Sequence, residues 1–284
     1  MSWERRISAV GKKEIPDKMS RGGSMLKGKV AVVTGSTSGI GLGIAQALAA
    51  AGCSIMMNGF GDPHEIEQLR LGIEKNFAVK ALFNGADLSK GDQCAELIRD
   101  AQARLGPVSI LVNNAGIQHV SPIESFPVDR WDAIIAINLC SSFHTIRTAL
   151  PGMKSAGWGR IINIASTHGL VASANKSAYV AAKHGVMGLT KTVALELAGT
   201  GVTCNAICPG WVLTPLVKKQ IEARAEREKI PVQQAEHDLL LEKQPSGQFT
   251  TVEQLGALVV FLCGPGGDNI TGVPLPVDGG WTAQ

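Results

Sequence analysis

A tyrosine and a lysine lie four residues apart, at Tyr179 and Lys183. Residues at this spacing share one face of a helix, so the phenol and the ammonium are expected to be neighbours. A free phenol, with a pKa of about 10, is a poor base at neutral pH. A nearby cation favours the phenolate and lowers that pKa. The pair therefore indicates a general acid/base that exchanges a proton with a substrate oxygen.

Two further polar residues are expected to complete a proton-transfer set. Ser166 follows the apolar run 160–165, and its hydroxyl is predicted to hydrogen-bond the substrate oxygen as charge develops there. Asn138 lies in a long helical stretch and is predicted to hold a water molecule that connects Lys183 to solvent. A tyrosine–lysine pair is frequent on helix surfaces, but these four residues in this order indicate catalysis.

A glycine-rich turn follows the first predicted strand and opens the first predicted helix. Gly35, Gly39 and Gly41 let the chain turn tightly and let its backbone approach a pyrophosphate. The start of the helix adds unpaired N–H groups and a partial positive charge. In this position the turn predicts a dinucleotide cofactor.

The choice of dinucleotide is expected to be decided after the second predicted strand. An acidic residue there binds the ribose hydroxyls of NAD, whereas an arginine binds the 2′-phosphate of NADP. Residues 58–62 contain neither arginine nor lysine, and residues 36–38 contain no basic residue. NAD is therefore favoured. Phe60 is expected beside the adenosine, Asp62 lies later than the usual acid, and Asp87 and Leu88 are placed to meet the adenine.

These residues must be positioned by an alternation of short β-branched runs and longer amphipathic stretches. That alternation is typical of an α/β fold with a parallel sheet and crossover helices. The predicted strands are 30–34, 54–58, 78–85, 108–112, 160–165, 202–208 and 273–277. The predicted helices are 40–51, 63–76, 90–104, 129–151, 176–199 and 252–263.

The alternation breaks once, between residues 212 and 250. This segment is polar and rich in charge, and it follows a strand at the edge where ligands bind, so a small helical substrate lid is expected there. A solvated helical excursion without function is the alternative. Residues 1–24 are expected to be a disordered extension ahead of a domain that covers 25–284.

Composition argues against several classes of partner. Residues 1–24 hold six basic and three acidic side chains, so the remaining chain is neutral overall and offers no patch for nucleic acid or membrane. No apolar run reaches the roughly 18 residues of a membrane span, and a cytoplasmic protein is expected. The six cysteines show no metal-ligand spacing, so no metal is expected and buried free thiols are predicted.

Together the motifs closely resemble the short-chain dehydrogenase/reductase family. The resemblance rests on residues 34–41, Asn113 to Gly116, Asn138, Ser166, Tyr179 with Lys183, and Pro209 with Gly210. It implies a single Rossmann-type domain, a doubly wound parallel sheet of about seven strands, and assembly as a homotetramer. The implied cofactor contacts are Gly35, Thr37, Gly39, Ile40, Gly41, Phe60, Asp87, Leu88, Asn114, Gly116, Tyr179, Lys183, Pro209, Gly210, Val212 and Thr214.

Four polar residues are expected around the reactive carbon, namely Gln118, His168, Lys176 and Gln220. One cation with several hydrogen-bond donors suits a small carboxylate. Within the family, this set resembles the bacterial dehydrogenases of D-3-hydroxybutyrate. The resemblance implies oxidation of (R)-3-hydroxybutyrate to acetoacetate, with the carboxylate on these four residues, beside Ser166 and Tyr179. The methyl side is then lined by the residues Trp211 and Trp281.

Two other functions remain open at this point. An NADPH-dependent 3-oxoacyl-thioester reductase shares the scaffold motifs, but it would need a basic residue near 36–38 or 59–62. A non-catalytic NAD-binding protein on the same fold is the second alternative. Such a protein need not keep all four members of the proton-transfer set.

Overall fold

The computed structural model describes residues 25–283, so the expected disorder of residues 1–24 lies outside the described residues. One parallel sheet of seven strands organises the molecule, in the order β3-β2-β1-β4-β5-β6-β7. The strands are β1 (Val30–Val33), β2 (Ser54–Asn58), β3 (Ala81–Asn84), β4 (Val108–Asn113), β5 (Gly159–Ile164), β6 (Val202–Pro209) and β7 (Pro274–Val277). The predicted single-domain α/β fold with seven parallel strands is confirmed.

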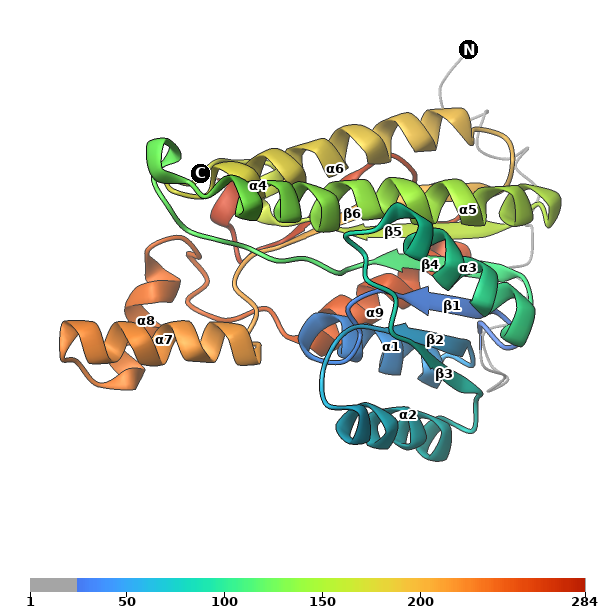
Figure 1. Cartoon of the computed structure of the whole chain (residues 1–284), viewed down its shortest axis with the longest axis horizontal. Coiled ribbons are helices and arrows are strands. Elements are labelled where there is room, and N and C mark those ends of the chain that lie inside the picture. The colour runs from blue at the N-terminus through green and yellow to red at the C-terminus, as the bar shows by residue number, and fades with distance from the viewer. Residues whose placement is uncertain (1–24, 284) are drawn as a thin grey trace, which may run out of the picture.

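Helices cover both faces of this sheet (Figure 1). They are α1 (Gly39–Ala50), α2 (Pro63–Phe77), α3 (Gly91–Leu105), α4 (Val128–Ile135), α5 (Ser141–Ser155), α6 (Ser177–Glu196), α7 (Pro215–Glu228), α8 (Val232–Leu241) and α9 (Val252–Cys263). Short helical turns are η2 (Ile123–Ser125), η3 (Ala136–Cys140), η4 (Thr167–Gly169), η5 (Pro265–Gly267) and η6 (Trp281–Ala283).

The central strands are apolar on both sides because each side meets a layer of helices. Successive residues of β1 point to opposite faces. Ala31 and Val33 pack in one core with α1 and α9, whereas Val30 and Val32 pack in the other with α3, α5 and α6. Continuous runs of buried residues in the sequence are thus explained by burial on two faces.

The long helical stretch Val128–Ser155 is a core element. Its length and mean hydropathy of 1.2 are those of a membrane-crossing helix. Its apolar side, however, carries Ile134, Ile146 and Met153, which are buried at 0–3% exposure inside the protein. Its apolar composition follows from packing beside α6 and on the sheet.

The segment between Val212 and Thr250 forms two helices, α7 and α8, that project from the body of the molecule (Figure 1). They pack on each other through a small apolar cluster that includes Val217, Ile221 and Ala235. Arg224 of α7 binds Glu242, just after α8, at 2.7 Å. The predicted helical segment is present; its role as a lid stays a prediction.

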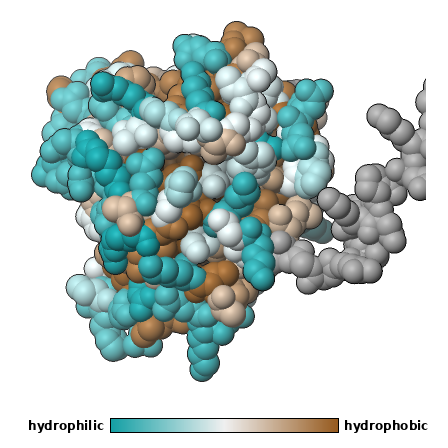
Figure 2. Space-filling view, turned by 90° about the vertical axis from the view of Figure 1, so that its right-hand side faces the viewer, coloured by the Kyte–Doolittle hydropathy of each residue, from teal (hydrophilic) through white to brown (hydrophobic). Residues whose placement is uncertain are grey.

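All six cysteines are free thiols, and five of them are buried. The prediction of burial is wrong for Cys140, which is exposed on the outer side of the stretch Val128–Ser155. Its neighbour Leu139 packs on α6, where it lies against Gly185, whereas the side chain of Cys140 is exposed. Figure 2 shows the end of the molecule opposite α7 and α8, where hydrophilic side chains alternate with apolar ones.

Candidate active site

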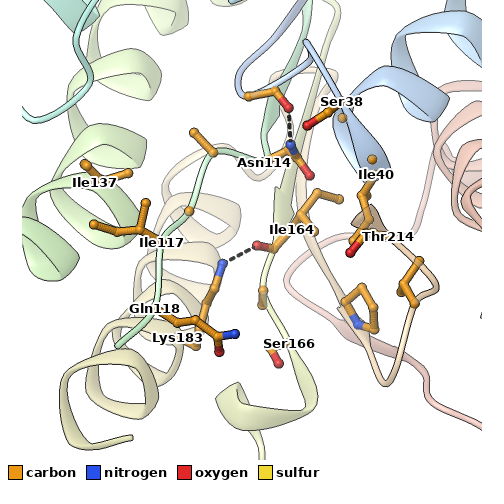
Figure 3. A pocket seen from close by; sticks show the side chains of 18 of the residues that line it. Ser38, Ile40, Asn114, Ile117, Gln118, Ile137, Ile164, Ser166, Lys183 and Thr214 are labelled. Atoms are coloured by element: carbon orange, nitrogen blue, oxygen red, sulfur yellow. Dashed lines mark hydrogen bonds between the residues drawn. The ribbon is translucent and has the colours of Figure 1, made fainter. Parts of the chain in front are cut away.

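A cavity of about 420 Å³ lies at the carboxyl edge of the sheet, where the chain crosses over from one side of β1 to the other. Ligands of open α/β sheets bind at such a switch point. The cavity extends from the glycine turn after β1 to the start of α6 and is lined by residues from nine separate segments. Figure 3 shows Ile40 and Thr214 on one side of it and Gln118 and Lys183 on the other.

The glycine turn has the backbone shape that the sequence predicts. Gly35 and Gly39 adopt positive φ angles of 61° and 52°, a region that favours glycine. At Gly41, a side chain would collide with the carbonyl of Gly35. Asn114, after β4, fastens the turn by donating from Nδ2 to the carbonyls of Thr34 at 2.9 Å and Gly35 at 3.0 Å.

The end of the cavity near β2 is lined by uncharged side chains, among them Thr37, Ser38, Asn58 and Phe60. Asn58 is buried and donates to the carbonyls of residues 84 and 86, which fixes the ends of β2 and β3 side by side. Phe60 is 68% exposed at the rim, and the Thr37 hydroxyl donates to its carbonyl at 2.8 Å. Sequence reasoning did not single out Asn58, although its amide follows a buried strand.

Two acidic residues near this end serve local structure. Asp62 caps α2: its carboxylate accepts from the backbone N–H groups of His64 at 2.9 Å and Glu65 at 3.1 Å. Asp87 does not line the cavity, in contrast to Leu88. Its carboxylate accepts from the hydroxyl and backbone N–H of Ser89, which lowers its pKa. The side chain of Asp87 thus organises the turn into α3, and its expected contact with adenine stays a prediction.

Lys183 is the buried cation of the site. It is 4% exposed, and its ammonium donates to the carbonyl of Ile164 at 2.7 Å (Figure 3). Burial lowers the pKa of this ammonium to about 8 because desolvation disfavours the charged form. The ammonium lies 5.6 Å from the centre of the Tyr179 ring, on the same face of α6.

Tyr179 and Ser166 lie at the end of the cavity away from the glycine turn. Burial raises the pKa of the Tyr179 phenol, and the nearby Ser166 hydroxyl partly opposes that rise. The protein without a bound cofactor therefore does not lower the pKa of Tyr179, contrary to the prediction from the sequence. Desolvation dominates here because the Lys183 ammonium is directed at the carbonyl of Ile164 instead of the phenol oxygen.

Asn138 is buried in a π-helical turn, η3, between α4 and α5. Its Oδ1 accepts from the backbone N–H of Ile117 at 2.9 Å, and its Nδ2 donates to the carbonyl of Ile117 at 2.9 Å. The side chain thus fixes the loop that leads to Gln118. The amide oxygen can accept a second hydrogen bond and the amide nitrogen can donate a second one, so the predicted water relay through Asn138 stays a prediction.

His168 is 6% exposed and packs edge-on against Tyr179, with ring centres 5.9 Å apart, and against Trp281 at 5.4 Å. Burial, together with the charge of Lys176, lowers its pKa to about 4. The imidazole is therefore neutral at pH 7. Its Nδ1 lies 3.4 Å from the Ser166 hydroxyl, and its Nε2 is buried without a hydrogen-bond partner.

Lys176 comes directly before α6, and its ammonium lies 5.8 Å from the centre of the Trp211 ring. Burial lowers the pKa of Lys176. The rings of Trp211 and Trp281 face each other at a centroid distance of 6.1 Å and a tilt of 35°. One positive charge and two indoles therefore form a wall of the cavity beside Tyr179 and His168.

The two glutamines of the predicted carboxylate set are placed differently. Gln118 lines the cavity, on the same side as Lys183 in the view of Figure 3. Gln220 lies on α7 and is outside the cavity lining in this arrangement of the helices. The assignment of Gln220 to the substrate stays a prediction.

The cavity thus combines three chemical functions. The glycine turn offers backbone N–H groups for phosphate at one end. Tyr179, Ser166 and Lys183 offer a proton-transfer set at the other end. Lys176, His168 and Gln118 offer a cation and hydrogen-bonding groups for an anionic group beside that set.

The chain is similar in sequence to known proteins along most of its length. The short chain dehydrogenase family matches residues 29–225. A D-beta-hydroxybutyrate dehydrogenase of Cupriavidus necator is 63% identical over 264 residues, which cover 92% of this chain and 100% of that protein. One of the same name from Rhizobium meliloti is 56% identical over 256 residues, which cover 90% of this chain and 99% of that protein.

The fold comparison agrees with the sequence comparison. The solved structure of a levodione reductase superposes with a TM-score of 0.83 and is 29% identical. The superposition covers 91% of this chain and 99% of the other. The similarity therefore extends over the sheet, the helices and the cavity together.

Proposed function

Because the chain belongs to the short chain dehydrogenase family, we propose that it oxidises (R)-3-hydroxybutyrate to acetoacetate with NAD⁺ and catalyses the reverse reduction. Two relatives named D-beta-hydroxybutyrate dehydrogenase, at 63% and 56% identity, support this substrate. The observation that carries the proposal is the position of Lys176 and His168 beside Tyr179 in one cavity.

The residues at the glycine turn fit NAD. A side chain at Gly35, Gly39 or Gly41 would meet neighbouring protein atoms, so these glycines allow the close-packed turn. The start of α1 that follows the turn offers backbone N–H groups to a pyrophosphate. The lining near Phe60 is uncharged, which suits ribose hydroxyls better than a 2′-phosphate. Asn114 holds the turn in shape. When bound, NAD⁺ supplies the acceptor for the hydride that leaves C3 of the substrate.

In oxidation, Tyr179 takes the proton of the substrate hydroxyl as the C–H bond at C3 breaks. Ser166 donates a hydrogen bond to the same oxygen and stabilises its developing charge. The ammonium of Lys183 favours the phenolate form of Tyr179 by its charge. In reduction, the same phenol returns the proton to the ketone oxygen, by microscopic reversibility.

The carboxylate of the substrate is held by Lys176, His168 and Gln118. Lys176 supplies the charge, while neutral His168 and Gln118 supply directed hydrogen bonds. A fixed carboxylate presents C3 to Tyr179 in one orientation, which accounts for selection of one enantiomer. Gln220 joins this set when α7 closes over the cavity, and Trp211 and Trp281 enclose the methyl group.

The test is a paired assay of NAD⁺ reduction with (R)- and (S)-3-hydroxybutyrate, repeated with NADP⁺. We expect turnover of the (R) enantiomer with NAD⁺ and a preference over the (S) enantiomer of at least about 100-fold, or roughly 3 kcal/mol. A parallel assay follows NADPH oxidation with acetoacetyl thioesters. Equal rates for the two enantiomers, or faster turnover of a thioester, would contradict the proposed substrate.

The proposal extends to assembly and location. We infer a homotetramer in the cytoplasm. Large apolar side chains exposed on helices of both faces of the sheet support the assembly: Phe143 of α5, Leu195 of α6 and Phe261 of α9. Exposed apolar patches on a folded protein mark interaction sites. Sedimentation velocity of the purified chain tests it, and a monomer at micromolar concentration would contradict it.

A further inference from the structure

The chain enters and leaves the α7–α8 segment at one place, beside the end of β7. It leaves the sheet through Gly210 and Trp211 after β6, and it returns through residues 244–250. The two passages are joined by a backbone hydrogen bond from Thr250 to the carbonyl of Trp211 at 2.9 Å. A short parallel bridge between Val212 and Thr250 adds to this joint. We call these two passages the lid base.

Gln244 is the buried polar side chain of the lid base, at 1% exposure. Its Oε1 accepts from the backbone N–H of Trp211 at 2.8 Å. Its Nε2 donates to the carbonyl of Gln248. One amide therefore satisfies a donor on the outgoing passage and an acceptor on the returning passage, which is a pairing that a methyl or carboxylate group cannot reproduce.

The surroundings of Gln244 leave this amide little freedom. A side chain at Gly210 would meet Oε1 at 2.5 Å, and one at Gly279 would meet Cγ at 2.6 Å. Ser246 donates its backbone N–H to the carbonyl of Gly279 at 3.0 Å, which holds the returning passage on the segment after β7. The Gln244 amide is thus clamped between the outgoing passage and the chain after β7.

Trp211 connects Gln244 to the cavity. Its backbone N–H is held by Gln244, while its indole lines the cavity, facing Trp281 at 6.1 Å and Lys176 at 5.8 Å. A shift of the Trp211 backbone would therefore move the indole against which the ammonium of Lys176 lies.

We propose that Gln244 is a positioning residue for substrate binding, which acts by holding Trp211 and thereby the wall formed by Trp211, Trp281 and Lys176. Gln244 does not line the cavity, so its effect is assigned to the Trp211 backbone that it holds and not to a direct contact with cofactor or substrate. The inference rests on the proposed function for the identity of the substrate, because that wall is assigned to the hydroxy acid. The effect of Gln244 is accordingly expected to be larger on substrate binding than on NAD binding, because the Trp211 indole faces Lys176 and Trp281.

Steady-state kinetics of Gln244→Met test the proposal, because methionine keeps a similar volume and removes both hydrogen bonds. Removing the partner of a buried N–H is expected to raise KM for (R)-3-hydroxybutyrate about tenfold. The Kd for NADH and the kcat should change by less than about threefold, since the wall binds the substrate equally in the ground state and the transition state. Unchanged KM in the folded variant would overturn the proposal.

Thr250→Val is the matched control. Thr250 is also buried in the lid base, and its hydroxyl donates to the carbonyl of Val277 at 2.8 Å, but its side chain has no bond to Trp211. Both variants lose a buried hydrogen bond, whereas only Gln244→Met frees the Trp211 N–H. We expect KM to stay within about twofold in the control. An equal rise of KM in both variants would overturn the assignment to Gln244.

Gln244→Glu is a second variant, and its readout is the pH dependence of KM. A residue that only fills space at position 244 would not produce such a dependence. A protonated carboxyl group can still accept from Trp211 and donate to Gln248, whereas an ionised one cannot donate. Because burial raises the pKa of a carboxyl group, KM of this variant should be near that of the unsubstituted protein at low pH and rise with pH. The ratio of the two KM values should climb about tenfold across the titration; a ratio independent of pH would argue against the proposal.

Hydrogen–deuterium exchange keeps this proposal separate from the proposed function. The amide of Trp211 is protected by Gln244, so Gln244→Met should speed its exchange at least about tenfold, and Thr250→Val should not. This measurement needs no substrate. Faster exchange in an enzyme that does not oxidise hydroxybutyrate would reject the proposed substrate but keep the positioning role of Gln244. Unchanged exchange of the Trp211 amide in Gln244→Met would reject that positioning role.

Discussion

At the scale of single residues, charge decides what the cavity accepts. Lys176 and Lys183 both have lowered pKa values because both are buried. A buried ammonium that lacks full hydration gains more from an anion than one in water does. Lys183 is directed at a carbonyl and lies close to the phenol, so we assign it to proton transfer. Lys176 lies over an indole, and its charge remains for a ligand.

Replacement of Lys176 by alanine should raise KM for (R)-3-hydroxybutyrate about 10- to 100-fold, the cost of one hydrogen bond to a charged group. The kcat should fall less, because Tyr179, Ser166 and Lys183 remain in place. Lys191→Ala is the control, since Lys191 is an exposed lysine on the same helix. An unchanged KM in Lys176→Ala would remove this lysine from the carboxylate site.

His168 links the site to the stability of the fold. Its pKa is lowered from 6.5 to about 4 in the folded protein. The unfolded chain therefore binds more protons between these values, so stability is full above about pH 6.5 and is lost as the pH falls toward 4. Between pH 7 and pH 5 the free energy of unfolding should fall by about 2 kcal/mol on account of His168 alone.

Urea unfolding of the unsubstituted protein and of His168→Asn at pH 7 and pH 5 measures this contribution. The variant should lose about 2 kcal/mol less over the interval, because asparagine does not titrate. Equal losses in both proteins would mean that His168 becomes protonated as readily in the folded state as in the unfolded chain.

At the scale of elements, Asp62 shows how one residue type can serve two roles. An acid after the second strand suggests a ribose contact, but Asp62 caps α2 with two backbone hydrogen bonds. Asp62→Ala should lower the free energy of unfolding by about 1 kcal/mol through loss of the cap. The ratio of kcat/KM for NAD⁺ and NADP⁺ should stay constant. Gain of activity with NADP⁺ would contradict the capping role and place Asp62 at the cofactor.

The elements themselves could largely be predicted from the sequence. Each of the seven strands lies within a few residues of its expected range, because burial on two faces leaves continuous apolar runs. The π-helical turn at Asn138 could not be predicted, since it depends on the tertiary contact of that amide with Ile117. The bounds of α7 and α8 could not be predicted from the sequence either, because their polar sequence carries little hydrophobic periodicity.

Within the site, residue types were predictable and orientations were not. The spacing of Tyr179 and Lys183 predicts one helix face, and the structure places both there. Asp87 turns to Ser89, and Gln220 lies outside the cavity lining, because these orientations depend on partners distant from any motif. Gln244 carries no motif at all and was missed for that reason.

At the scale of the whole molecule, the two ends of the sheet have separate tasks. The carboxyl ends of the strands hold the cavity. At the opposite end, the buried guanidinium of Arg160 binds Asp268 and the carbonyls of Gly159 and Gly201, and it packs against the ring of Trp158. Arg160 is 2% exposed, whereas Asp268 is 62% exposed, so the carboxylate gives the buried charge a link to solvent.

Asp268→Asn should therefore lower the free energy of unfolding by about 1–2 kcal/mol, because the buried Arg160 keeps its charge and loses its counter-charge. The value is below that of a fully buried pair, since Asp268 is largely solvated. KM and kcat should be unchanged, because this cluster lies at the end of the sheet remote from the cavity. Chemical denaturation and steady-state kinetics of the variant check both expectations; a changed KM would contradict the separation.

Tyr179 is the one tyrosine in the chain. In proteins with many phenols, ionisation of the reacting one is hidden among the others. Here an ultraviolet difference spectrum of tyrosinate, or the single resonance of isotope-labelled tyrosine, reports the protonation state of the general acid/base and of nothing else. The protein thus carries a built-in spectroscopic probe at the atom where the proton moves, without any engineered label.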